Sequence, residues 1–158
     1  MMTKAAHIRP MHHYQQGVGM LEILISILVL AIGLLGLAAL QTVGMKYNHQ
    51  SYQRTQAVIL GYGVTDRIRS NIASRLAYST AYGDDPGQPA TGTCQLATCT
   101  SAQMAAYDLA LWKQSIKELL GDNADGQIAY DATTQLHKIQ IKWKENERDF
   151  EMVQEVVL

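Results

Sequence analysis

One uninterrupted apolar run, from Ile23 to Leu40, restricts the folds that are open to this chain. The run contains no charged residue, and Ser26 is its only clearly polar side chain. As an α-helix that rises about 1.5 Å per residue, it would span roughly 27 Å, close to the thickness of a bilayer core. A helix buried in a small domain normally carries a polar stripe, which this run lacks. The run therefore predicts a membrane-spanning helix.

The remainder of the chain narrows the functional classes. A length of 158 residues suits one modest domain, and 13 basic against 14 acidic residues give a net charge of −1. This balance offers no reason to expect a nucleic-acid partner. The sequence contains no glycine-rich phosphate loop, no zinc-ligand spacing and no catalytic constellation. We therefore predict a protein that is not an enzyme and that needs no cofactor and no metal.

A single carboxylate, Glu22, stands at the head of the apolar run. A charged side chain in a membrane helix costs a few kcal/mol at the bilayer centre, and a plain anchor has no use for one. Cleavage of the chain between Gly17 and Val18 would give this charge a partner. The new amine of Val18 would lie one helical turn from Glu22, and opposite charges in apolar surroundings must be paired. Pairing within one chain, or between chains offset by one turn, would set an assembly register.

Two other interpretations of the N-terminus stay open on the residues alone. The polar tail before Val18 holds Lys4 and Arg9 and no acid, as a secretory signal would, although the apolar run exceeds the usual length of about 7–15 residues. A plain single-pass anchor is the second possibility. Basic residues flank the apolar run on both sides, so the positive-inside rule does not decide its orientation.

The N-terminal pattern resembles the class III signal of type IV prepilins and pseudopilins, in the residues Gly17, Val18, Met20–Leu21 and Glu22. In that family a membrane-embedded prepilin peptidase cleaves after the glycine and N-methylates the new first residue. The resemblance implies cleavage at Gly17–Val18, methylation of Val18, and Glu22 as the assembly glutamate at mature position five. Two positions depart from the family, which usually has Phe where this chain has Val18 and often has Thr where it has Gly19.

Three further runs resemble one group within the family, the PilV minor pilins or type IV pilus modification proteins. They are LAIGLLGLAALQ at Leu30–Gln41, TDRIRSN at Thr65–Asn71, and AAYDLALWK at Ala105–Lys113, which follows a cysteine pair. The resemblance implies a role in pilus assembly and its initiation, and through the pilus in twitching motility and adhesion. The implied partners are prepilin peptidase, other minor pilins, the major pilin and inner-membrane lipid.

Two alternative functions accompany this reading. A minor pseudopilin of a type II secretion system would carry the same N-terminal signal. A single-pass envelope protein with a periplasmic binding domain would need the apolar run only as an anchor.

The patterns and the resemblance together predict an α+β pilin fold. A long N-terminal helix, half transmembrane and half amphipathic, would continue to about Ser74 and pack on a small antiparallel sheet, with a second helix beside it. Apolar residues recur along the amphipathic half, roughly at helical spacing in its second part, and are expected to form its apolar side. They are Val43, Tyr47, Val58, Gly61, Val64, Ile68 and Ile72. The expected parts are a leader at 1–17, a transmembrane and assembly helix at 18–40, its amphipathic continuation at 41–80, and a periplasmic head at 81–158.

The second helix is predicted from its caps and its spacing. Thr100 and Gln103 form a possible capping box, and Gly121 is placed to end the helix. Its apolar face is expected to comprise Ala105, Leu109, Trp112, Ile116 and Leu119.

The predicted strands follow the second helix. They cover Gln127–Tyr130, His137–Lys144 and Phe150–Val157, after a turn at residues 122–126. Ile139, Ile141 and Trp143 share one side of the second strand, and we expected His137 on the polar side.

Two cysteines, Cys94 and Cys99, lie in a stretch rich in Gly, Pro, Thr and Asp that reads as a loop. With a membrane segment upstream, a disulfide in an oxidising compartment is the natural interpretation, and two unrelated thiols are the alternative. Two sulfur ligands without a nearby histidine leave a metal shell incomplete. A disulfide would place the C-terminal part of the chain in the periplasm, with the helix in the inner membrane until the subunit enters the fibre or its tip.

Overall fold

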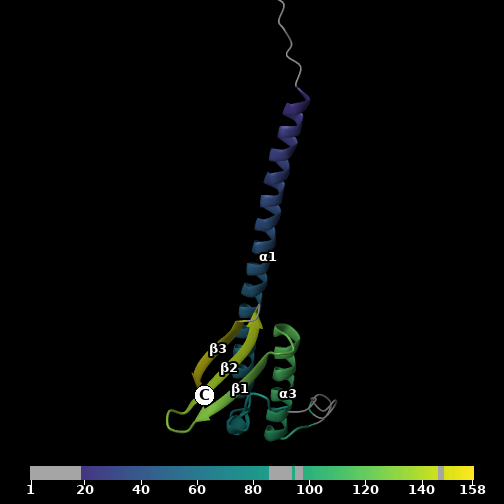
Figure 1. Ribbon diagram of the computed structural model, residues 1–158. Helices are drawn as coiled ribbons and strands as arrows, with labels where there is room; N and C mark the ends of the chain where they lie inside the picture. Colours follow the sequence, from purple (N-terminus) through teal and green to yellow (C-terminus); the bar gives the residue numbers. More distant parts are fainter. Residues whose placement is uncertain (1–18, 86–93, 95–97, 146–147) are drawn as a thin grey trace, which may run out of the picture. The chain divides into compact units, whose positions relative to one another are not determined.

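The computed structural model describes residues 19–85, 94, 98–145 and 148–158 (Figure 1). Its elements are two helices, a short 3-10 segment and three strands. In chain order they are α1 (Met20–Ser70), η1 (Ile72–Ala77), α3 (Ser101–Leu120), β1 (Asp125–Asp131), β2 (Leu136–Glu145) and β3 (Arg148–Val157). This is the α+β layout predicted for a pilin. The chain divides into two compact units, Met1–Gly44 and Met45–Leu158, and each is described by itself.

The first unit consists, in its described part, of the N-terminal portion of α1. Every described residue from Gly19 to Gly44 is exposed, and Leu35 reaches 72%. Among the described helices, α1 is the one long and apolar enough to cross a membrane. A helix that is apolar on all sides and buries none of them within its own chain requires lipid or neighbouring helices.

The α-helix ends earlier than the sequence predicts, at Ser70 rather than near Ser74. The chain leaves helical geometry at Asn71, which has φ −123° and ψ 47°, and continues as the 3-10 segment η1. The Asn71 side chain donates a hydrogen bond of 2.7 Å to the carbonyl of Ser101, at the start of α3. A contact between elements therefore ends the helix, and no glycine or proline marks that point in the sequence.

The second unit buries one side of α1 against the rest of the head. The buried positions are Ala57, Gly61, Val64, Thr65 and Ile68. Three of the predicted inward positions are thereby confirmed. The other members of the predicted apolar side, Val43, Tyr47, Val58 and Ile72, are exposed. Ile72 is exposed because the α-helical spacing has already stopped before it.

The three strands form one antiparallel sheet in the order β1-β2-β3. In Figure 1, β1 lies on the α3 side of the sheet and β3 on the opposite side. Ile128 faces Ile139 across the first pair of strands, and Ile141 faces Met152 across the second. An isolated bridge between Thr80 and Ile128 adds a short pairing to β1.

The inner side of β2 supplies much of the core. Ile139, Ile141 and Trp143 are buried as predicted. The expectation for His137 was wrong, because side chains alternate along a strand and His137 shares the face of Ile139. His137 is fully buried, with Nε2 3.3 Å from the carbonyl oxygen of Arg75, and its Nδ1 has no partner among the described residues.

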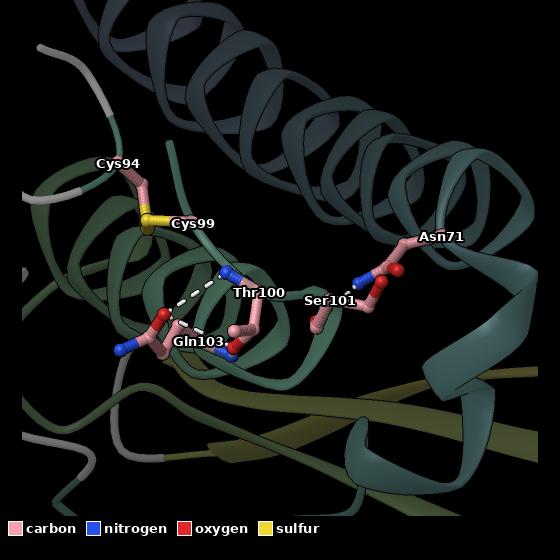
Figure 2. Close-up of a disulfide and its surroundings, with 6 residues drawn as sticks. All are labelled: Asn71, Cys94, Cys99, Thr100, Ser101 and Gln103. Carbon is pink, nitrogen blue, oxygen red and sulfur yellow. Dashed lines mark hydrogen bonds between the residues drawn. A yellow bond between two sulfur atoms is a disulfide. The ribbon is translucent and has the colours of Figure 1, made fainter. Parts of the chain in front are cut away.

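The helix α3 begins and ends as its sequence predicts. The Thr100 hydroxyl accepts a hydrogen bond from the amide of Gln103 at 3.3 Å, and the Gln103 side chain accepts one from the Thr100 amide at 2.9 Å (Figure 2). This is the predicted capping box. Gly121 ends the helix with φ +105°, a conformation that side-chain-bearing residues rarely adopt.

The inward face of α3 differs from the prediction at one position. Ala105, Leu109, Trp112 and Ile116 are buried as expected. Leu119 is 41% exposed, and the neighbouring Leu120 is buried in its place.

Gly126 on β1 allows the closest approach between the sheet and α3. A methyl group built on Gly126 would collide with the indole ring of Trp112 and the terminal methyl of Ile116. Trp112 has little freedom to move, because its indole N–H donates a hydrogen bond of 3.1 Å to the carbonyl of Leu60 on α1. The contact fixes the separation of α3 and β1.

We expect Gly126→Ala to lower the free energy of unfolding by about 1–3 kcal/mol, the usual cost of overfilling a packed core. The control is Gly63→Ala on α1, where an added methyl group meets nothing within 4 Å. That change should leave stability unchanged or raise it by about 0.5–1 kcal/mol, because alanine favours a helix. Denaturant unfolding in detergent, followed by near-UV circular dichroism, measures both. Equal stability of the two variants would contradict the close packing.

Candidate functional site

The predicted assembly glutamate, Glu22, lies in the first turn of α1 and is exposed. Its backbone amide donates to the carbonyl of Gly19 at 2.9 Å, and its own carbonyl accepts from the Ser26 hydroxyl at 2.7 Å. No ion pair joins the Glu22 carboxylate to another described residue. A carboxylate at this end also meets the positive pole of the helix dipole.

Gly17 and Val18, the residues of the predicted cleavage and methylation site, lie outside the described residues. The helix begins at Met20, just after them. Cleavage, methylation and the pairing of Glu22 with a Val18 amine remain predictions.

In the second unit, Met45–Leu158, two runs that are far apart in the sequence meet through an ion pair. Nη1 of Arg67, from the run Thr65–Asn71, lies 3.1 Å from Oδ1 of Asp108, from the run Ala105–Lys113. The sequence alone does not predict this contact between the two runs. An ion pair between two helices can be predicted only when it is known which faces of the helices are in contact.

Tyr78 completes this contact from the segment after η1. Its hydroxyl donates a hydrogen bond of 2.6 Å to the second carboxylate oxygen of Asp108, and the side chain is buried. Burial and then the hydrogen bond to Asp108 raise the pKa of Tyr78 to about 12. The phenol therefore stays protonated near neutral pH and keeps its role as a donor.

A cavity of about 520 Å³ lies at the same junction. It is lined by Asp66, Arg67, Ser70, Asn71, Cys99, Ser101, Met104 and Asp108. Both signs of charge line it, and the Arg67–Asp108 pair already neutralises part of them. Among the described residues, no group of His, Cys, Asp or Glu is arranged to hold a metal ion.

A second buried charge, the cation Lys113, fixes the segment that precedes the cysteine loop. Its ammonium group donates to the carbonyls of Ala81 and Asp84 at 2.7 and 2.8 Å. It also lies 3.2 Å from Oδ1 of Asp125 at the start of β1. Sequence reasoning missed this contact, because a lysine between Trp112 and Gln114 reads as an ordinary exposed helix position.

Asp125 belongs to the segment predicted as a turn, and the structure places it at the start of β1. Burial acts to raise the pKa of its carboxyl group. Hydrogen bonds from the amides of Gly83 and Gly126, together with Lys113, outweigh burial and lower that pKa. The carboxylate is thus ionised and serves as the counterion of Lys113.

A third buried charge, Glu145, joins the sheet to α1. The indole N–H of Trp143 donates to the Glu145 carboxylate at 2.8 Å, and Arg54 on α1 lies 3.6 Å from its other oxygen. The Arg54 guanidinium also lies over the ring of Phe150, 4.7 Å from the centroid. The second half of α1 is therefore held to the sheet by a charged contact as well as by apolar packing.

The two cysteines are joined in the disulfide that the sequence analysis favours. The Cα atoms of Cys94 and Cys99 are 5.3 Å apart, and the bridge immediately precedes the Thr100 cap of α3 (Figure 2). Cys99 also lines the cavity. The ring therefore lies where the chain enters α3.

The comparisons with known proteins agree with this arrangement. Residues 12–38 match the family model described as the prokaryotic N-terminal methylation motif, and residues 39–110 match the one described as type IV pilin Tt1218. The first match includes Gly17, Val18 and Glu22, and the second includes the disulfide and the Arg67–Asp108 contact. The two matches are to a type IV pilin domain and to the N-terminal methylation motif of prepilins. Comparisons with curated proteins and with solved structures found no match.

We expect Asp108→Ala to destabilise the head by about 1–3 kcal/mol, because it leaves two donors, Arg67 and Tyr78, without their acceptor. The control is Asp66→Ala, which removes a carboxylate only one residue from Arg67. Asp66 pairs with Arg69 on the exposed helix surface at 3.3 Å, and such pairs contribute little. Thermal unfolding of the two variants measures the difference, and an equal loss in both would contradict the structural role of Asp108.

Proposed function

We propose that this chain is a minor type IV pilin that is cleaved between Gly17 and Val18 and acts by assembly. The observation that carries the proposal is Glu22. It stands as a single exposed carboxylate at the head of an apolar helix, inside the stretch that matches the methylation motif.

The apolar surface of α1 supports a two-stage role. Before assembly, lipid of the inner membrane covers the side chains from Ile23 to Leu40, and this keeps the subunit in the bilayer. After assembly, the corresponding helices of other subunits take the place of lipid. The exchange costs little, since lipid tails and helix side chains are equally apolar.

Glu22 provides the register for that exchange. Cleavage would create an ammonium group on Val18, which prepilin peptidase then methylates. The Glu22 carboxylate would neutralise this group on the same or an adjacent subunit, because neither charge is tolerated alone in apolar surroundings. Where the pair forms between subunits, a neighbour must lie at the correct axial offset to bring the two charges together.

The finer assignment is to the PilV minor pilins, and it rests on the three sequence runs that resemble them. It gives the chain a role in initiating or modifying the pilus, together with other minor pilins and the major pilin, and thereby in twitching motility and adhesion. The disulfide supports a head in the oxidising periplasm. In this proposal residues 1–17 are the leader, 18–40 the assembly helix, 41–80 its continuation and 81–158 the head.

Mass spectrometry of the mature N-terminus tests the processing step. We expect the protein isolated from its own cells to begin at N-methylated Val18. The same chain from cells without prepilin peptidase should retain Met1 and the leader. A wild-type protein that begins at Met1, or that has been cut near Ala39 after the apolar run, would refute the proposal.

The role of Glu22 is tested by Glu22→Gln, which keeps the size of the side chain and removes its charge. We expect cleavage to remain largely intact and the amount of subunit in sheared fibres to fall to background, because the Val18 amine loses its partner. Ser26→Ala is the matched control, since it removes a polar group one turn further along the same helix. Normal incorporation of the Glu22→Gln subunit would exclude the pairing role.

A further inference from the structure

In the described part of the chain, β3 is an edge strand of the sheet, and its outer side has no strand partner. Among the described residues, β3 pairs only with β2, whereas β1 carries the additional bridge from Ile128 to Thr80. Figure 1 shows β3 at the border of the sheet away from α3. An edge strand presents unpaired backbone donors and acceptors, and an extended segment of another chain can bind to them.

Six side chains of β3 are exposed, and beyond the basic Arg148 at its start they are acidic or apolar. The acidic and apolar ones are Asp149, Glu151, Val153, Glu155 and Val157. Val153 is 49% exposed and Val157 is 66% exposed. The strand therefore combines carboxylates that attract a basic partner with apolar surface that a partner can cover.

The side of β3 that pairs with β2 shows which kind of strand complements the acidic residues of β3. Each acid lies directly opposite a lysine of β2. The pairs are Asp149 with Lys144, Glu151 with Lys142, and Glu155 with Lys138. Two of these pairs approach within 4.0 Å. A strand with outward lysines at matching positions on the free edge would meet the same carboxylates from the other side, and opposite charges across strands are favourable.

The central carboxylate is already held in place. The hydroxyl of Tyr82 and the amide group of Gln140 both donate to Oε1 of Glu151, each at 2.9 Å. Burial and then this hydrogen bond raise the pKa of Tyr82, so the phenol remains a donor. An acidic side chain fixed in this way loses little freedom when a partner binds, which favours binding.

A second copy of the same chain is a poor occupant of this edge. In a two-fold antiparallel pair centred on Val153, Glu151 of each copy would face Glu155 of the other. Like charges directly opposite one another destabilise strand pairing. Charged residues on edge strands commonly prevent self-association in this way.

We propose that β3 is a docking edge for an extended strand of a partner protein that carries lysines on alternate, outward-facing positions. Backbone hydrogen bonds along β3 supply the pairing, and Asp149, Glu151 and Glu155 select a basic strand. The proposal stands independently of cleavage at Gly17–Val18 and of the role of Glu22.

The probe is a labelled peptide of alternating lysine and valine, with a peptide of alternating glutamate and valine as its counterpart. Binding to the full chain in zwitterionic detergent is measured by fluorescence anisotropy, and hydrogen–deuterium exchange locates the contact. We expect the basic peptide alone to bind and to protect the amides of β3. Glu155→Lys should weaken binding roughly five- to tenfold, because it replaces an attraction by a repulsion.

The control is Glu118→Lys, which makes the same charge change on the exposed side of α3. It should leave peptide binding unchanged. If Glu155→Lys does not fold, Glu155→Gln tests the same site with a smaller expected loss. An equal effect of both lysine variants, an absence of protection on β3, binding of the acidic peptide, or self-association through this edge would each overturn the proposal.

Discussion

The apolar surface of α1 is the constraint on which the rest of the molecule depends. From Ile23 to Leu40 it has no polar side, and its described residues bury nothing within the chain. The surface must therefore be covered by lipid or by other helices. A carboxylate at its head, Glu22, adds the requirement that one end of the helix find an opposite charge. An apolar helix with one charge at its head agrees with the match to the N-terminal methylation motif.

In the second unit, buried charges help to hold a small sheet and two helices together around a modest core. Each major junction includes a partly or wholly buried charge. Asp108 connects α3 with α1, Lys113 connects α3 with β1, and Glu145 connects the sheet with α1. A buried charge that loses its partner is costly, so these contacts favour one relative placement of the elements over slightly shifted ones. Gly126 acts toward the same end by allowing α3 to approach β1 closely.

The sequence was sufficient for the elements and insufficient for the contacts between them. Capping chemistry located both ends of α3, and period-two alternation located β2, because these signals depend on neighbours along the chain. The end of α1 was misplaced, because a side chain from Asn71 to the α3 terminus determines it. Leu119 was predicted to be buried, but Leu120 is buried instead, for a similar reason. The last turn of α3 has two adjacent apolar residues, and only packing determines which one is buried. The error at His137 was avoidable. His137 is two positions before Ile139 on the same strand, so its side chain must lie on the same face of the sheet. The buried charges carried no local signal at all.

The position of the disulfide limits which part of the fold it can stabilise. Cys94 and Cys99 are separated by only five positions, and both precede α3. A ring this small restricts the unfolded chain modestly, by about 2 kcal/mol on a chain-entropy estimate. Among the described residues, the bridge joins none of the elements α1, α3, β1, β2 and β3 to another. The junctions between these elements rest instead on Asp108, Lys113 and Glu145. The bridge therefore constrains the entry to α3, and the placement of the elements depends on charge.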